Sequence, residues 1–151
     1  MNNNLYELYK IFNSKYFNNN LPKSSDIIIE WSGRLTASAG ICYPKSFKPI
    51  IRLSTHYHKD FPEDVECTLL HEMIHLKVQG HGKDFKNEIS RINSLGGNAK
   101  RYSKRRATEK KTNWIYKCLS CNKEYKRTRR FPNINKYRCG VCKGKLEEIQ
   151  A

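Results

Sequence analysis

The stretch 71–81, HEMIHLKVQGH, constrains this chain of 151 residues more than any other part of its sequence. It begins with the motif H-E-x-x-H. On a helix, His71 and His75 lie one turn apart on the same face, so that two imidazoles can bind one metal ion. Glu72 lies beside them, close enough to take a proton from metal-bound water. The motif therefore predicts a helix that carries a metal site.

A third histidine would complete the ligand set of a catalytic zinc. Gly80 favours a helix end, after which the chain can turn and bring His81 to the same ion. Three histidine nitrogens and one water are typical of a catalytic zinc, which keeps one position open. Two alternatives remain: Glu88 could be the third ligand instead, or the motif histidines could be ordinary core residues. The apolar surroundings favour a buried active-site helix; they are Leu69, Leu70, Met73, Ile74 and Leu76.

Four of the six cysteines form two C-x-x-C pairs, which predict a second metal site. The four are Cys118, Cys121, Cys139 and Cys142. The pairs are separated by 17 residues, a spacing that fits a four-thiolate structural zinc in a zinc ribbon. A redox dithiol is the alternative, but it would need one pair near the start of a helix. The other cysteines, Cys42 and Cys67, are expected to be small buried residues.

The apolar pattern elsewhere predicts an α+β fold. A helix is expected over 5–17 and strands over 27–31, 37–43 and 49–53, followed by a loop at 54–61, the metal helix at about 62–79 and a third helix at about 85–95. We expect a small, mostly antiparallel sheet packed with the metal helix and two further helices. A C-terminal β zinc ribbon is expected to follow.

Basic residues are concentrated in the last third of the chain. Residues 1–98 carry 12 Lys and Arg against 10 Asp and Glu, whereas residues 99–151 carry 17 against 4. A module this basic is typical of nucleic-acid binding, the alternative being a solubilising surface. The expected domains are a metal-site domain at 1–97, a basic linker at 98–113 and the ribbon at 114–151.

Between the two cysteine pairs, cations alternate with aromatic residues. Cations can bind phosphates and aromatic rings can stack on unpaired bases, so this stretch is expected to bind DNA or RNA with little sequence preference. Tyr125 and Phe131 could instead pack the ribbon. The expected nucleic-acid-binding residues are Tyr125, Lys126, Arg127, Arg129, Arg130 and Phe131.

The segments 68–75 (TLLHEMIH) and 80–85 (GHGKDF) resemble the SprT-like zinc metalloproteases, which are relatives of Spartan. Segments 39–43 and 51–54 are also similar to that family, as is a zinc module after the protease part. The resemblance implies a SprT-like metalloprotease domain at 1–97. Its zinc ligands would be His71, His75 and His81, and its catalytic acid and base would be Glu72. The resemblance also implies proteolysis associated with DNA, because the Spartan branch degrades proteins crosslinked to DNA.

We therefore expect a zinc-dependent endopeptidase that cleaves proteins bound or crosslinked to DNA, in DNA–protein crosslink repair. It would hold one catalytic and one structural Zn²⁺, with Glu72 activating a zinc-bound water. One alternative is a nucleic-acid-binding zinc-ribbon protein with an inactive metalloprotease-like domain. Another is a zinc hydrolase that acts on a different bond. The sequence does not select the residue that stabilises the oxyanion; Tyr43, Tyr57 and His58 are candidates.

The expected partners are DNA, single-stranded DNA included, and proteins bound to it. No run of 18 apolar residues and no secretory signal is visible in the sequence, so we expect no membrane partner. The expected location is the cytoplasm, at the nucleoid if the source is bacterial. No heptad pattern or exposed apolar stripe calls for a partner chain, so a monomer is expected.

Overall fold

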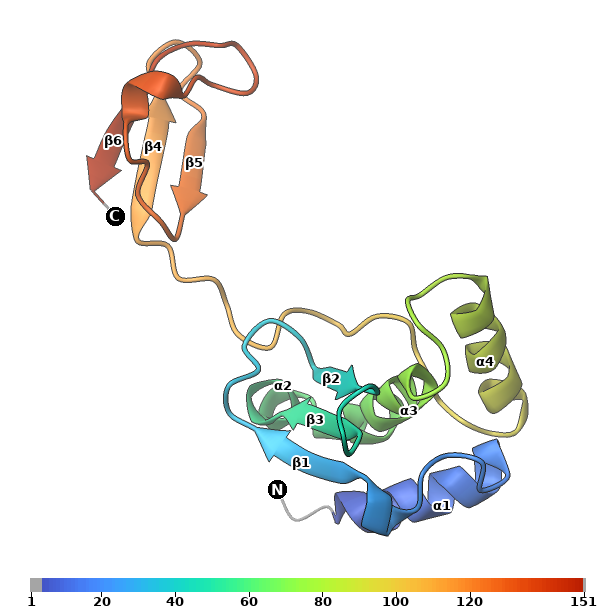
Figure 1. Cartoon of the computed structure of the whole chain (residues 1–151). Coiled ribbons are helices and arrows are strands. Elements are labelled where there is room, and N and C mark those ends of the chain that lie inside the picture. Colours follow the sequence, from blue (N-terminus) through green and yellow to red (C-terminus); the bar gives the residue numbers. More distant parts are fainter. Residues whose placement is uncertain (1–3, 151) are drawn as a thin grey trace. The chain divides into compact units, whose positions relative to one another are not determined.

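The computed structural model describes residues 4–150, except the side chain of Gln150. They divide into two compact units, the first ending at Thr108 and the ribbon unit beginning at Glu109 (Figure 1). Most of the segment expected to be a linker packs on the first unit, where Ala99 and Ala107 are buried. Among the described residues, no helix is long and apolar enough to cross a membrane.

The first helix, α1 (Leu5–Phe17), supplies one wall of the core. The Asn4 side chain caps its start by accepting a hydrogen bond from the Glu7 N–H at 3.3 Å. Its aromatic face is buried, as the sequence pattern predicts: Tyr9, Phe12, Tyr16 and Phe17. The helix ends where Asn18 takes a left-handed conformation with a φ of 49°. Asparagine tolerates that conformation better than most residues.

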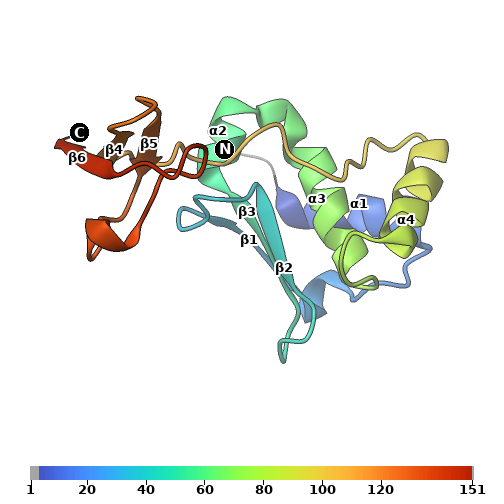
Figure 2. The same cartoon turned by 90° about the horizontal axis from the view of Figure 1, so that it is seen from above.

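Three short strands form the sheet of the first unit: β1 (Ile28–Ser32), β2 (Gly40–Tyr43) and β3 (Ile50–Ser54). The order is β1-β3-β2, with β3 parallel to β1 and antiparallel to β2. The sheet is therefore mixed, and the expectation of a mostly antiparallel sheet is corrected. The β2–β3 hairpin leaves the far edge of β3 open, and β1 pairs there. Seen from above, α1, α3 and α4 lie on one side of this sheet (Figure 2).

Four helices in the described part of the chain complete the α+β class, which is confirmed. The expected loop before the metal helix contains α2 (Thr55–Asp60), capped by the Ser54 hydroxyl, which accepts from the Tyr57 N–H at 3.2 Å. The metal helix, α3 (Val65–His75), follows a 3-10 turn, Pro62–Asp64, and ends one turn earlier than expected. Helix α4 (Lys83–Ser94) packs against α3.

Residues 99–108, which we call the return segment, lead from α4 back across α3 toward β2 (Figure 1). The Asn93 side chain holds its start with two hydrogen bonds to the Ala99 backbone, of 2.8 and 3.0 Å. The hydroxyl of Tyr57 accepts from the Lys104 N–H at 2.9 Å. At its end, the Thr108 N–H donates to the Thr36 carbonyl at 2.9 Å. Three separate anchors therefore fix this segment.

The ribbon unit is a small antiparallel sheet. It is built from β4 (Trp114–Cys118), β5 (Glu124–Arg127) and β6 (Leu146–Gln150), with the order β5-β4-β6. A 3-10 turn, Ile134–Lys136, lies between β5 and β6. The unit buries few side chains, and two of the most buried are Cys118 and Cys139. The expected β zinc ribbon is confirmed as a fold by this arrangement.

Candidate functional site

Three histidine rings meet at the C-terminal end of α3. The Nε2 atom of His71 lies 3.2 Å from that of His75 and 3.0 Å from that of His81, and the last two are 3.2 Å apart. Tetrahedral zinc–nitrogen bonds of about 2.0–2.1 Å would separate the nitrogens by roughly 3.3 Å. Gly80, with a φ of 70°, makes the turn that returns His81 to α3. The three nitrogens therefore have the spacing of one metal ion's ligands.

Backbone carbonyls set the orientation of two of these rings. The Nδ1 of His71 lies 2.7 Å from the Lys100 carbonyl oxygen, and the Nδ1 of His75 lies 3.1 Å from that of Val78. A carbonyl oxygen only accepts, so each Nδ1 carries the proton and each Nε2 presents a lone pair. Lone pairs that face each other at about 3 Å need a cation between them, which fits a metal ion. Histidines that bind a metal usually donate their other ring N–H to a carbonyl or a carboxylate, as these two rings do.

The surroundings of His71 and His81 favour their neutral forms. Burial lowers the pKa of His71 to about 4, and the neighbouring rings of His75 and His81 act in the same direction. Burial also lowers the pKa of His81, with His75 and the positive charge of Arg101 contributing. The buried ring of Phe85 lies below all three, with centroid distances of 4.7 to 4.9 Å. Neutral imidazoles are the form that binds a metal.

The carboxyl group of Glu72 lies against β2 and outside the group of histidines that could hold an ion. The residue is 5% exposed, and burial raises the pKa of its carboxyl group to about 8. A Cβ atom added to Gly40 would come within 3.0 Å of Glu72 Oε1, so only glycine leaves this carboxyl group its place. Strand β2 and helix α3 thus position the glutamate together.

An open cleft of about 560 Å³ contains the three histidines and Glu72. One wall is β2, which is an edge strand of the sheet. The opposite wall includes residues 100–104 of the return segment. The sequence predicts a linker there, because its basic composition carries no apolar periodicity. Its contribution to the cleft depends on the hydrogen bond between Lys100 and His71, which no motif indicates.

The alternative third ligand, Glu88, is engaged elsewhere. Its carboxylate accepts from Arg91 at 2.8 Å and pairs with Lys77 at 3.4 Å. Burial acts to raise its pKa, but these two cations outweigh that effect and lower it. The structure therefore brings His81, and not Glu88, to the other two histidines.

The four ribbon cysteines also converge. Their sulfur atoms all lie within 4.8 Å of one another, with 3.4 Å between Cys118 and Cys142 and 3.6 Å between Cys121 and Cys139. The Tyr125 hydroxyl accepts from the Gly140 N–H at 3.0 Å and lies 3.1 Å from the Cys139 sulfur. Hydrogen bonds from the Cys142 N–H and from Tyr125 lower the pKa of Cys139 to about 5. A sulfur held as thiolate is the ligand that zinc needs.

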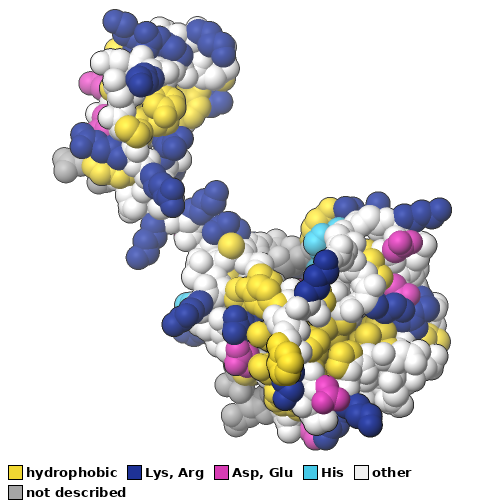
Figure 3. Space-filling view, viewed as in Figure 1, with side chains coloured by type: hydrophobic (Ala, Val, Ile, Leu, Met, Phe, Trp, Pro, Cys, Tyr) yellow, Lys and Arg dark blue, Asp and Glu magenta, His cyan; other side chains and the backbone are white. Residues whose placement is uncertain are grey.

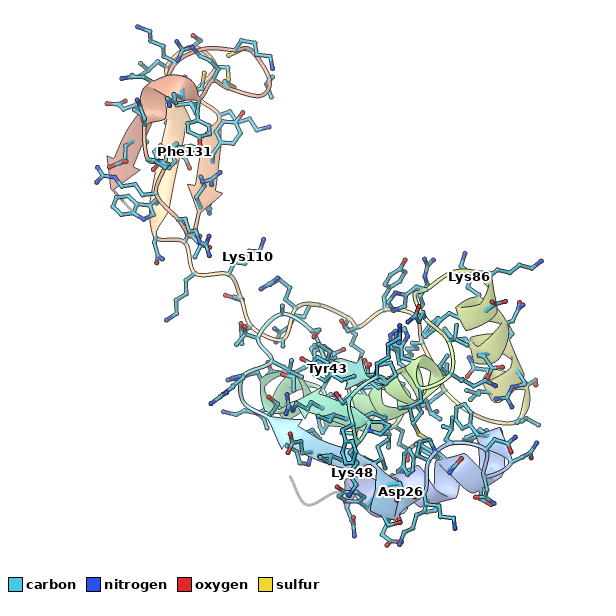
Figure 4. All side chains as sticks on the ribbon, viewed as in Figure 1. Asp26, Tyr43, Lys48, Lys86, Lys110 and Phe131 are labelled. Carbon is cyan, nitrogen blue, oxygen red and sulfur yellow. The ribbon has the colours of Figure 1, made fainter. Side chains whose placement is uncertain are left out.

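The expected nucleic-acid-binding residues differ in whether they are exposed and whether they already form ion pairs within the ribbon. Lys126, Arg127 and Arg129 are exposed and form no ion pair within the described part of the ribbon, whereas Arg130 pairs with Glu148 at 2.9 Å. Phe131, which is labelled in Figure 4, stacks on Tyr137 with the ring centroids 3.9 Å apart. The Arg127 guanidinium lies over the Phe131 ring, 4.1 Å from its centroid.

Both aromatic residues of the predicted set thus make contacts within the ribbon, Tyr125 with Cys139 and Phe131 with Tyr137, and nucleic-acid binding by this set stays a prediction. Figure 3 shows Lys and Arg side chains gathered over the visible face of this unit, around a hydrophobic patch. A cleft of about 350 Å³ on the ribbon is lined by Tyr125, Arg127, Phe131 and Tyr137. Tyr137 is 39% exposed, and it lies outside the set that the sequence predicts.

Fold and site together define a protein with three histidines that could hold a metal ion on an α+β body, and four cysteines that could hold another in a ribbon. The sequence model of the SprT-like family matches residues 5–108, and that of the SprT-like zinc ribbon domain matches residues 112–150. The chain belongs to the SprT-like family, which confirms the resemblance in its sequence.

The chain is similar to proteins from two species of Streptococcus and from Drosophila melanogaster. Over 125 residues the chain is 33% identical to Protein SprT-like from Streptococcus thermophilus, covering 77% of this chain and 80% of that protein. Over 127 residues it is 35% identical to Protein SprT-like from Streptococcus pyogenes, covering 78% and 81%. Over 149 residues it is 29% identical to Germ cell nuclear acidic protein from Drosophila melanogaster, covering 92% of this chain and 14% of that protein.

Proposed function

We propose that this chain is a zinc-dependent endopeptidase that cleaves proteins bound or crosslinked to DNA. One observation carries the proposal: three imidazole nitrogens converge within 3.2 Å at an open cleft, next to the buried carboxyl group of Glu72. Three nitrogen ligands leave one position of a tetrahedral ion free, as in catalytic zinc sites.

The residues of the proposed site would have two roles, metal binding and proton transfer. His71, His75 and His81 hold the ion, and the carbonyls of Lys100 and Val78 keep two of the rings in position. When bound, zinc supplies a Lewis acid that acidifies water and polarises a carbonyl group. Glu72 takes the proton of the attacking water and delivers it to the amine that leaves, which is general base and then general acid catalysis.

The cleft suits an extended segment of polypeptide. Strand β2 is an edge strand, and it lines the cleft opposite the return segment. An extended peptide can add to a free strand edge through main-chain hydrogen bonds, with little dependence on its side chains. Broad selectivity of this kind is what a protease for varied DNA-bound proteins requires.

The ribbon unit supports association with DNA. Residues 109–151 carry 12 Lys and Arg against 4 Glu, and the cations of β5 and the following loop are exposed. Exposed cations bind phosphates and give an affinity that falls as the salt concentration rises. A ribbon bound to DNA would raise the local concentration of the metal site near proteins on the same DNA.

The test is cleavage of a DNA-binding protein by the zinc-loaded full chain, with and without single-stranded DNA. We expect cleavage that DNA stimulates, and its loss in Glu72→Gln with the zinc content unchanged. Glu66→Gln is the matched control, because Glu66 is an exposed glutamate on the same helix. DNA binding without cleavage would favour the alternative, a nucleic-acid-binding protein with an inactive metalloprotease-like domain. A fully active Glu72→Gln variant would contradict the mechanism.

A further inference from the structure

The proposed reaction places negative charge on the oxygen of the scissile carbonyl, and a group of the protein must bind that charge. Of the residues that the sequence suggests, Tyr57 is fully engaged. Its hydroxyl donates to Asp64 Oδ2 at 2.7 Å and accepts from the Lys104 N–H at 2.9 Å. A hydroxyl whose proton is already donated to a buried carboxylate is not available to a substrate.

The other two candidates are engaged as well. Both ring nitrogens of the buried His58 are bonded, Nδ1 to the Ser54 carbonyl at 2.8 Å and Nε2 to the Thr68 hydroxyl at 2.9 Å. Tyr43 is not among the residues that line the cleft, and the Arg52 guanidinium lies 5.7 Å from the centroid of its ring. The role therefore falls to a residue outside the three.

Arg101, in the return segment, has the features that this role needs. It lines the same cleft as the three histidines. Its Nε is buried and, within the described part of the chain, has no hydrogen-bond partner. The guanidinium lies 4.9 Å from the centroid of the Tyr102 ring, which restricts where it can point. A buried donor without a partner is rare in folded proteins, and a ligand that supplies an acceptor is one explanation for it.

The backbone around Arg101 is fixed on both sides. The carbonyl of the preceding residue, Lys100, binds His71 Nδ1, and the Lys104 N–H binds Tyr57. Two other cations of the return segment are neutralised, Lys104 by Glu63 at 2.8 Å and Arg105 by Asp60. Arg101 is thus a cation on a fixed stretch of backbone, and two of the other four cations of the segment, Lys104 and Arg105, are paired with carboxylates.

We propose that the Arg101 guanidinium binds the carbonyl oxygen of the substrate as that oxygen becomes an anion, an inference that rests on the proposed peptidase function. The oxygen of water forms a bond to the carbonyl carbon, its proton passes to Glu72, and the π electron pair of the C=O bond moves to the oxygen. Arg101 N–H groups donate to that oxygen. When the C–N bond breaks, the electron pair re-forms C=O and Glu72 returns the proton to the amine nitrogen. Donors held in place for such an oxyanion commonly contribute more to rate than any other single group.

A phosphinic peptide tests the anion site without any turnover, because its tetrahedral P(O)O⁻ group has the shape and charge of the reacting centre. Calorimetry on the zinc-loaded full chain should show that Arg101→Ala weakens binding about 100-fold or more. Arg101→Lys should weaken it less, since lysine keeps the charge but not the fork of donors. The control Arg106→Ala, an exposed arginine of the same segment, should bind as the wild type does. Equal affinity in the wild type and Arg101→Ala overturns the inference.

Kinetics and metal content separate this role from a structural one. We expect kcat to fall about 100- to 1000-fold in Arg101→Ala with little change in KM and in zinc content, and added guanidinium ion to restore part of the rate. Wild-type kcat in this variant overturns the inference and leaves the peptidase function standing. If Arg101→Ala loses its zinc, Arg101→Lys with full zinc carries the test, and an unchanged kcat there overturns the inference. A wild-type chain that binds the phosphinic peptide through Arg101 but cleaves no protein refutes the peptidase function, and with it the oxyanion role, while the anion site at Arg101 stands.

Discussion

Replacement of Gly40 by alanine tests how β2 and α3 position the catalytic carboxyl group. An added Cβ would lie 2.9 Å from Thr68 Cγ2 and 3.0 Å from both Glu72 Cγ and Glu72 Oε1. Carbon atoms normally approach to about 3.5–4.0 Å, so the overlap is roughly 0.5–1 Å. Thr68 cannot turn away freely, because its hydroxyl is bonded to His58 at 2.9 Å. Glu72 must therefore move.

The expected cost has two parts. Overpacking of this kind destabilises a protein by about 1–3 kcal/mol. Alanine also lowers the conformational entropy of the unfolded chain relative to glycine, which offsets about 0.4–1 kcal/mol of that cost. We expect a net loss of up to about 2.6 kcal/mol in the free energy of unfolding of the first unit. A displacement of up to 1 Å at a catalytic group can cost about 100-fold in rate. The zinc content should stay unchanged, since the three closest contacts of the added Cβ are with Thr68 and Glu72 and none of them is with a histidine.

The assay compares urea unfolding, zinc content and cleavage rate for Gly40→Ala and the matched control Gly33→Ala. At Gly33 an added Cβ meets only Thr55 Oγ1, at an ordinary 3.8 Å, so this variant should keep wild-type stability and rate. A Gly40→Ala variant as stable and as active as Gly33→Ala would refute the placement of Glu72 against β2.

Three further predictions concern the packing around the two metal centres. Tyr57→Phe should cost about 1–3 kcal/mol of stability in urea unfolding, because it leaves the Lys104 N–H and a buried Asp64 oxygen without their partner. Burial acts to raise the pKa of Asp64, but hydrogen bonds from Tyr57 and Lys104 outweigh it and lower the pKa below the usual 3.8. Its contribution to stability is thus complete above that value and is lost as the pH falls through the lowered pKa, and Asp64→Asn should remove this dependence from unfolding midpoints measured against pH. Tyr125→Phe removes the hydroxyl next to the Cys139 sulfur, so competition with a chelator should show a ribbon zinc affinity about 10- to 100-fold weaker.

The parts of the molecule that the sequence predicts are those set by local spacing. Helix α3 carries His71 and His75 on one face because residues four apart meet on a helix. The ribbon is predicted by the two C-x-x-C pairs, because the two short cysteine loops only need to come together. The buried face of α1 follows from its apolar period in the same way.

The parts that could not be predicted depend on contacts distant in sequence or on main-chain groups. The parallel pairing of β1 with β3 is selected by the free edge of β3, which the strand pattern does not encode. Helix α2 is only six residues long and depends on the Ser54 cap. The hydrogen bond between His71 Nδ1 and the Lys100 carbonyl uses the main chain of residue 100, so the residue type at that position does not predict it. The position of Arg101 in the cleft follows from that same bond.

The most direct test of the metal centre is an anomalous difference map recorded at the zinc edge from crystals of the full chain. Two peaks are predicted. One should lie among the four cysteine sulfurs, and the other about 2.0–2.1 Å from Nε2 of each of His71, His75 and His81, with no fourth side chain bound. A map with no peak at the histidines, or one in which another side chain fills the fourth position, would contradict the account.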